Sequence, residues 1–255
     1  MSFFNSLGRG FGRSSRKNKH ATSSQQNYNR QPAAQPAGQS SMGFLYNSNN
    51  SRRQQTPVPQ GPVPKPLFLS QPFLKTALVK GSFNTIVARP NRSIHRDLTE
   101  ANEFFTYLNL FYGIILDHCT SRTCPSMSAG PGIDYTWLDS SKRQIKLPAS
   151  TYIDYVLTWI SNKLVDQSLF PTRAGVPFPP NFPATLQNIF KQMFRIFAHI
   201  YHSHFDMIYH LSLEAHWNSF FAHFISFSKE FELLDKRDTE PLRELIENFE
   251  AQGKI

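Results

Sequence analysis

The chain has 255 residues, which is long enough for one sizeable core plus a tail and favours one or two domains. Its charge is unevenly divided: of the 27 Lys and Arg residues, 14 lie in the first 96 positions, and no Asp or Glu precedes Asp97. The remainder carries 13 basic and 18 acidic residues, so the pI of 9.6 reflects the tail and a basic folded body is excluded.

The two cysteines, Cys119 and Cys124, are too few to predict a disulfide-rich secreted domain. The first residues lack the continuous apolar run of a secretory signal, and nothing downstream reaches the ~18 apolar residues that a membrane span needs. The start is rich in Arg and Ser and free of acidic residues, which leaves a mitochondrial presequence as an alternative. We therefore expect an intracellular, soluble protein.

Residues 1–66 are rich in Ser, Asn, Gln, Gly, Pro and Arg, a composition that cannot bury enough apolar surface to offset chain entropy. We predict a disordered basic tail with a Pro-rich linker over 1–66 and a folded domain over 67–255. Hydroxyls in the tail are candidate phosphorylation sites: Ser14, Ser15 and Thr56. An alternative is a scaffold that binds nucleic acid or an anionic membrane through basic and aromatic tail residues, namely Arg13, Arg16, Lys17 and Lys19 with Phe3, Phe4 and Phe11.

The folded part begins with PLFLSQPFLKTALVKGSFNTIV, residues 66–87, which we interpret as an extended apolar arm packed on a body. A helix is predicted from Asp97 to His118, because apolar residues recur there at steps of three and four. Tyr135 to Leu147 is typical of a short hairpin that turns at residues 139–141. The stripe of the predicted helix consists of Phe104, Tyr107, Leu108, Phe111 and Ile115.

A second helix is expected to be capped by Ser150 or Thr151, and a loop with five prolines must follow from Pro171 to Pro183. Helices are then predicted over residues 184–234, and a last one begins at Asp238 or Thr239 and ends near Gln252. The second helix carries the stripe Ile153, Leu157, Ile160 and Leu164. The sequence thus predicts an all-α fold, a helical bundle with one short β-hairpin.

Two thiols and three imidazoles form a candidate metal site: Cys119 and Cys124 follow one helix, and His199, His202 and His204 lie in another. Two thiolates and two imidazoles satisfy tetrahedral zinc. The choice of histidines stays open, because positions 199 and 204 differ by about 140° on a regular helix, whereas His199 and His202 share a face more easily. We expect the first pair to reach one ion only if the helix is distorted or ends there. All five residues could instead be ordinary buried side chains.

Four long runs resemble the Mob (Mps-one-binder) family: TCPSMSAGPGIDYTWLD, LFPTRAGVPFPPNF, FKQMFRIFAHIYHSHF and EAHWNSFFAHFISFSKEFELLDKRDTEPLRELI. Together they place the resemblance over residues 67–252, closest to the fungal Mob-two branch. The resemblance implies zinc ligands at Cys119, Cys124, His199 and His204 and a closed, structural site. It also implies a cytoplasmic protein with nuclear and cell-cortex or growth-site pools, whose partner is an NDR/LATS-class kinase controlling polarity and morphogenesis.

The resemblance further implies that the basic N-terminal extension of the kinase binds at the helix before the first cysteine. The matching positions are Asp97, Glu100 and Glu103, with His223 on a later helix. The acidic residue and Trp common in the family are missing, because residues 94–97 read Ile-His-Arg-Asp. A phosphopeptide-binding patch of the Mob-one branch falls on Lys191, Gln192 and Arg195, and its neutral Gln predicts weak phosphopeptide binding.

Three functions follow from these observations. The first is a non-catalytic adaptor that binds and activates a protein kinase. The second is a zinc enzyme with Asp206 or Glu214 as general base, which the closed ligand set disfavours. The third is a nucleic-acid-binding module that acts through the basic tail, disfavoured by the acidic body.

Overall fold

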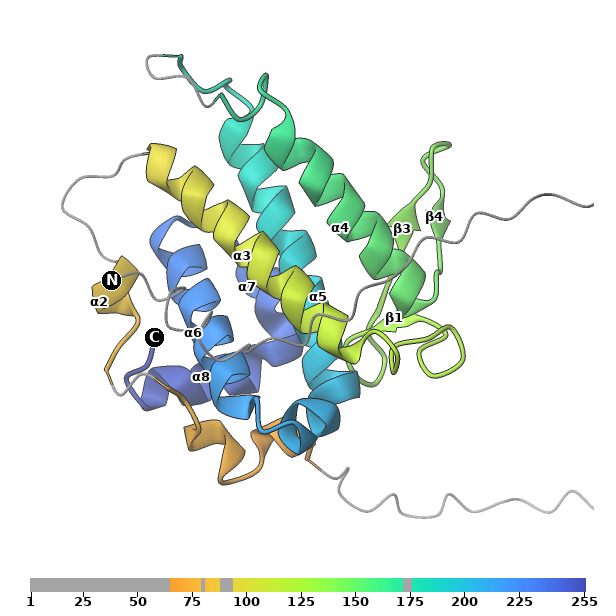
Figure 1. Ribbon diagram of the computed structural model, residues 1–255, viewed down its shortest axis with the longest axis vertical. Coiled ribbons are helices and arrows are strands. Elements are labelled where there is room, and N and C mark those ends of the chain that lie inside the picture. Colours follow the sequence, from red (N-terminus) through yellow and green to blue (C-terminus); the bar gives the residue numbers. More distant parts are fainter. Residues whose placement is uncertain (1–64, 79–80, 88–93, 172–175) are drawn as a thin grey trace, which may run out of the picture. The chain divides into compact units, whose positions relative to one another are not determined.

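The computed structural model describes residues 65–78, 81–87, 94–171 and 176–255, and the side chains of Ile86 and of residues 94–100 are not among those described. The expected tail, residues 1–66, therefore lies almost wholly outside the described residues, as do the side chains of Asp97 and Glu100. The described part is mostly helical (Figure 1). None of its helices is long and apolar enough to cross a membrane.

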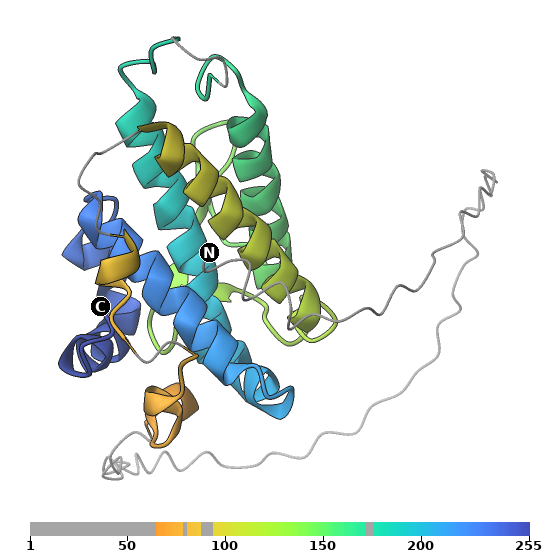
Figure 2. The same ribbon diagram turned by 60° about the vertical axis from the view of Figure 1, so that its left-hand side comes forward.

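The body is built around α5 (Phe182–His210), which contacts α3 (Ile94–Ile115), α4 (Ala149–Val165) and α6 (Glu214–Glu230). Figures 1 and 2 show α3, α4 and α5 running side by side, with α6 against the other flank of α5. The chain closes with α7 (Lys236–Thr239), the 3-10 helix η3 (Glu240–Leu242) and α8 (Arg243–Ala251). Fifteen side chains of α5 are buried, which makes it the central helix.

Aromatic rings fill the space between α3, α5 and α6. The ring centroid of Phe197 lies 4.8 Å from that of Trp217 and 4.8 Å from that of Phe224. Phe104 of α3 packs edge-on against Phe190 at 5.8 Å. Because such rings bury large areas and interlock at defined angles, they hold the three helices in one arrangement. The stripe predicted for α3 is confirmed: Phe104, Leu108, Phe111 and Ile115 are buried and Tyr107 is half-buried.

The boundaries of two helices differ from the prediction. α4 begins at Ala149, not at a Ser150 or Thr151 cap, because the carbonyl of Cys124 accepts the Ala149 backbone N–H at 3.0 Å. The last helical segment begins earlier than predicted: Asp235 caps α7 by accepting the Asp238 N–H at 2.9 Å. The predicted end near Gln252 is confirmed, since α8 ends at Ala251 and Gly253 has a positive φ.

Two small antiparallel sheets are present where one hairpin was predicted. The expected hairpin pairs β3 (Trp137–Leu138) with β4 (Gln144–Ile145). The second pairs β1 (Met127–Ser128) with β2 (Asp134–Tyr135) and was not anticipated. Two-residue strands carry too little alternation of apolar and polar residues to be recognised from a sequence.

The predicted arm packs on the body, but it is not simply extended. It contains η1 (Leu67–Leu69), η2 (Phe73–Lys75) and α2 (Asn84–Val87). Asn218 of α6 donates hydrogen bonds to the carbonyls of Phe73 and Thr76 at 2.9 and 3.0 Å, and accepts one from the Tyr201 hydroxyl. These bonds satisfy backbone groups that an irregular arm would otherwise leave unpaired. Four apolar side chains of the arm are buried: Phe68, Leu74, Phe83 and Val87.

Candidate metal centre

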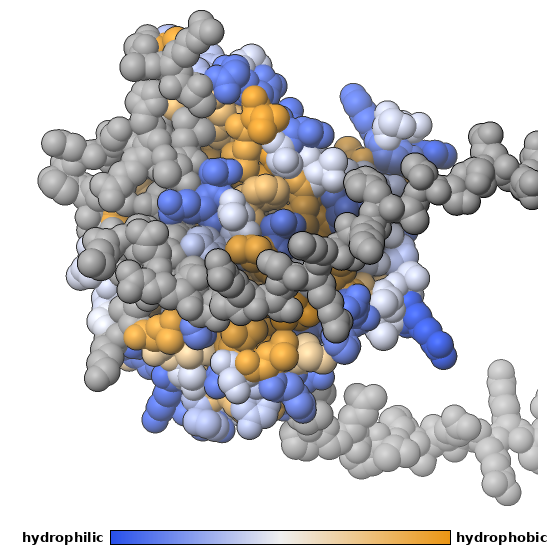
Figure 3. Space-filling view, viewed as in Figure 1, coloured by the Kyte–Doolittle hydropathy of each residue, from blue (hydrophilic) through white to orange (hydrophobic). Residues whose placement is uncertain are grey.

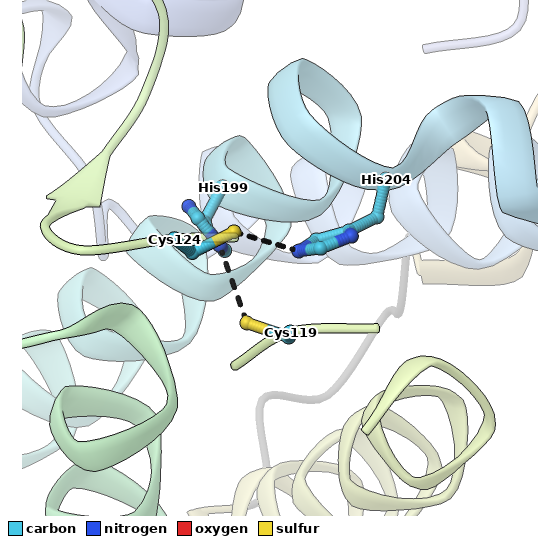
Figure 4. Close-up of side chains that lie close together, drawn as sticks. All are labelled: Cys119, Cys124, His199 and His204. Atoms are coloured by element: carbon cyan, nitrogen blue, oxygen red, sulfur yellow. Dashed lines mark hydrogen bonds between the residues drawn. The ribbon is translucent and has the colours of Figure 1, made fainter. Parts of the chain in front are cut away.

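Two cysteines and two histidines converge between the loop after α3 and the middle of α5 (Figure 4). Cys119 Sγ lies 3.5 Å from His199 Nε2, and Cys124 Sγ lies 3.4 Å from His204 Nε2. All four donor atoms lie within 4.8 Å of one another, and all four residues are buried. Around tetrahedral zinc, with Zn–S about 2.3 Å and Zn–N about 2.05 Å, neighbouring sulfur and nitrogen atoms are about 3.5 Å apart. The two measured contacts match this separation, so the donor set fits a zinc ion.

The orientation of His199 is set by the backbone of β1. Its Nδ1 donates to the Ser128 carbonyl at 2.8 Å, which leaves Nε2 as the donor atom that faces the thiols. Ser128 is itself held in register, because it pairs with Asp134 of β2. Such a hydrogen bond to the far nitrogen fixes the tautomer and the ring plane of a metal-ligating histidine. The unanticipated hairpin therefore positions one of the four candidate ligands.

The cysteine-bearing loop is ordered by its own backbone bonds. The Cys119 N–H donates to the Ile115 carbonyl at 3.0 Å, and the Cys124 N–H donates to the Thr120 carbonyl at 2.8 Å. The Thr123 hydroxyl donates to the His118 carbonyl at 2.6 Å. Since Cys124 also accepts from the first turn of α4, the loop joins α3 to α4 while presenting both sulfur atoms to α5.

The structure brings His199 and His204, and not His202, to the two thiols. The expectation was that the helix is distorted or ends at the site, and it does not end there, because α5 continues through His204 to His210. Both imidazoles are long enough to reach one point beside the helix, as Figure 4 shows. His202 instead bonds the Pro241 carbonyl through Nε2 at 2.9 Å and packs against Phe68, with ring centroids 5.0 Å apart.

Burial keeps both imidazoles and the Cys119 thiol uncharged in the absence of an ion. Burial lowers the pKa of His204 to about 4 and also lowers the pKa of His199. Burial and the neighbouring Cys124 raise the pKa of Cys119 well above that of an ordinary thiol. Neutral imidazoles are ready to bind a cation, whereas a buried thiol must lose its proton when it becomes a ligand. This combination suits a site whose thiolates are stabilised by the ion itself.

Comparison with known proteins identifies the family of this chain. Residues 75–242 match the model of the Mob1/phocein family. The chain belongs to this family. It is 59% identical over 192 residues to the CBK1 kinase activator protein MOB2 of Candida albicans, an alignment that covers 74% of this chain and 61% of that protein. It is 54% identical over 222 residues to the maintenance of ploidy protein mob2 of Schizosaccharomyces pombe, covering 86% and 90% of the two chains. The Saccharomyces cerevisiae protein with the same name as the Candida relative is 59% identical over 194 residues, covering 74% and 67%.

The basic patch of this Mob protein is engaged by its own side chains. Lys191 forms an ion pair with Asp238 at 3.0 Å. Arg195 donates to the Tyr152 hydroxyl at 2.7 Å, and its guanidinium carbon lies 4.9 Å from the centroid of the Tyr135 ring. The same Tyr152 hydroxyl donates to Gln192 at 3.0 Å, so all three side chains of the patch have partners within the protein, although only Lys191 has an acidic one.

The predicted kinase-binding residues are not equally accessible. Glu103 is half-buried on α3. His223 is only 2% exposed, because Phe104 and Phe83 cover its ring with centroids 5.0 and 6.0 Å away. The His223 ring therefore packs beneath the outer surface instead of forming part of it. Twelve of the 17 residues of α6 are buried, so the polar His223 lies in the core and not at the surface.

Gly130 and Ser128 are structural residues of the Mob site that the sequence interpretation overlooked. Gly130 has φ +92°, and a Cβ atom there would lie 2.7 Å from His202 Nδ1. The Gly-Pro-Gly run at residues 130–132 was the available signal, since such runs mark tight turns.

Proposed function

We propose that this Mob protein is a non-catalytic adaptor that binds and activates an NDR/LATS-class serine/threonine kinase and acts in cell polarity and morphogenesis. The observation that carries the proposal is the 59% identity to two fungal proteins that are named kinase activators. Binding of an adaptor activates a kinase when the adaptor has higher affinity for the active arrangement than for the inactive one.

We propose zinc as the ion of the Cys119, Cys124, His199 and His204 site. Two thiolates and two imidazoles fill a tetrahedron, which leaves no position for a water that the ion would activate. The ion would supply structural cross-linking, and the histidines and cysteines would hold α5 against the loop after α3. Metal analysis of the purified protein should find one zinc per chain, and cobalt-substituted protein should show a tetrahedral spectrum that is unchanged by small anions. A spectrum that responds to anions would favour the zinc enzyme, with Asp206 or Glu214 as base.

The outward side of α3 is the surface we propose for the kinase. Glu103, Tyr107, Leu110 and Ile114 recur at helical spacing, and Leu110 is 49% exposed. Burial and the nearby Glu103 carboxylate raise the pKa of Tyr107, so charge and aromatic surface adjoin there. Figure 3, in the view in which α3 lies at the front, shows hydrophobic patches among hydrophilic ones. A partner segment rich in Lys and Arg with apolar anchors complements this combination.

Binding of a purified NDR-class kinase extension, measured by calorimetry, tests the proposal. Glu103→Lys should weaken binding by repulsion, and Leu110→Asp should weaken it by placing a charge at the apolar contact. Val165→Asp is the matched control, because Val165 is 69% exposed on a different helix, α4. Kinase activity should rise on addition of the wild-type protein. If the wild-type protein neither binds the extension nor stimulates the kinase, the proposal is wrong.

We further propose that the protein is cytoplasmic with nuclear and cell-cortex or growth-site pools, and that residues 1–66 form a tail separate from the domain at 67–255. The family resemblance and the tail's composition support these points. Imaging of the fluorescently tagged full chain tests the first. Limited proteolysis tests the second, with early cleavage expected before residue 67.

A further inference from the structure

A cavity of about 330 Å³ opens beside the candidate metal centre. Its walls come from the cysteine-bearing loop and from the turn of α5 that carries His204. Among the described residues that line it are Cys124 and His204, whereas Cys119 and His199 are not. The remaining lining residues are mostly polar: His118, Thr123, Pro125, Ser126, Ser128, Ser203, Asp206 and Met207. The cavity therefore reaches two of the four proposed ligands.

The exposed fractions of the four proposed ligands divide them into the same two pairs. His199 is fully buried and Cys119 is 1% exposed, while His204 is 5% and Cys124 is 7% exposed. A filled tetrahedral site exchanges its ion only when an incoming donor replaces a protein ligand, because no coordination position stands open. Such a donor can approach only where a ligand meets solvent. An incoming donor therefore replaces Cys124 or His204 first, and it replaces Cys119 and His199 last.

Two further side chains of metal-ligand type line the cavity. His118 precedes Cys119 in the loop, Asp206 follows His204 by two residues on α5, and both are exposed. An imidazole and a carboxylate are ordinary zinc donors. His118 comes from the loop that carries the cysteines, and Asp206 comes from the helix that carries the histidines. A cation in the cavity would meet both before it reached the thiols.

We propose that this cavity is the route by which the ion enters and leaves, with His118 and Asp206 as transient ligands on the way to Cys124 and His204. The inference rests on the proposed metal site. The carboxylate of Asp206 attracts a divalent cation and repels an anionic chelator. Its removal should therefore slow zinc uptake and speed zinc removal by an anionic chelator, each about two- to five-fold for a single charge near a surface.

Stopped-flow transfer of zinc between the full-length protein and chelators tests the role of the Asp206 carboxylate. Asp206→Asn should change uptake and removal in opposite directions, and removal by a neutral chelator should change little. General loosening of the site would instead speed removal by both chelators, and that result would overturn the proposal. Asp117→Asn is the matched control, since Asp117 is exposed and adjoins His118 in sequence but does not line the cavity. An equal effect of this control would also contradict the assignment.

A cavity-filling variant tests the route independently. Ser203 is exposed and lines the cavity, so Ser203→Phe should slow both uptake and removal about ten-fold or more while leaving one zinc per chain. Thr158→Phe, at an exposed position of α4, should leave both rates unchanged. Unaltered rates in Ser203→Phe would overturn the proposed route but would leave the proposed metal site unaffected. Absence of zinc from the wild-type protein would instead refute the site itself.

Discussion

Replacement of Cys124 by serine tests how much the proposed metal centre stabilises the domain. The substitution removes one of two sulfur donors and leaves a hydroxyl, which is a poor ligand for zinc at neutral pH. In the wild-type protein the ion would join segments 80 residues apart in the sequence, as the separation of Cys124 and His204 shows. We expect the variant to lose most of this stabilisation, because an ion that binds only the folded state stabilises it by an amount that rises with the logarithm of its affinity.

The magnitude follows from linkage. At a free zinc concentration 1,000 times the Kd, binding stabilises the folded state by about 4 kcal/mol. For a domain of about 150–250 residues each kcal/mol corresponds to about 2–4 °C, so the Tm should fall by about 8–16 °C. The donor atoms already lie at zinc-compatible separations, 3.4 and 3.5 Å, so little of the binding energy is needed to assemble the site.

The assay is thermal unfolding followed by circular dichroism, with and without a strong chelator. The wild-type Tm should fall when the ion is removed, and the Cys124→Ser Tm should be low and insensitive to chelator. If the wild-type Tm stays constant after metal analysis confirms complete removal, the ion does not hold α5 to the loop and the reasoning fails.

Three further substitutions test the surrounding structure. Gly130→Ala should lower the free energy of unfolding, measured by chemical denaturation, by about 2–4 kcal/mol, because the positive φ and the His202 imidazole 2.7 Å away both oppose a Cβ atom. Gly132→Ala, with a positive φ but open space, should lower it by about 1 kcal/mol. Asn218→Ala should destabilise the protein by about 2–4 kcal/mol and speed proteolysis within residues 65–78, because the carbonyls of Phe73 and Thr76 lose their hydrogen-bond donor. The control Asn162→Ala, at an exposed position of α4, should do neither. Asp235→Ala should lower the Tm by a few degrees through loss of the α7 cap. The backbone N–H of Asp238 lowers the pKa of Asp235, so this stabilisation exists above the ordinary aspartate pKa and disappears as the pH falls through the lowered value.

Local patterns predicted the long helices well and the short elements poorly. The stripe of α3 was recognisable because one face meets the core and the other meets solvent. The start of α4 was misplaced because its first N–H is satisfied by Cys124, 25 positions earlier in the chain, which no local signal indicates. The burial of polar residues on α6 was not predicted either: Asn218 and His223 are both buried.

The sequence alone determined the chemistry of the candidate site: which residue types are present, and that four of them suit zinc. It also determined that residues 97–255 carry a net negative charge and that the first 96 residues are basic. Residue spacing left open which histidine joins His199, and the family resemblance implied His204. The tertiary structure brings His204 to the thiols, which helical angles cannot predict because they do not say where the cysteine-bearing loop lies. It likewise decided that Ser128 orients His199 and that two of the four ligands meet solvent. Those facts depend on contacts between distant segments, which arise only when the aromatic core brings α3 and α5 together.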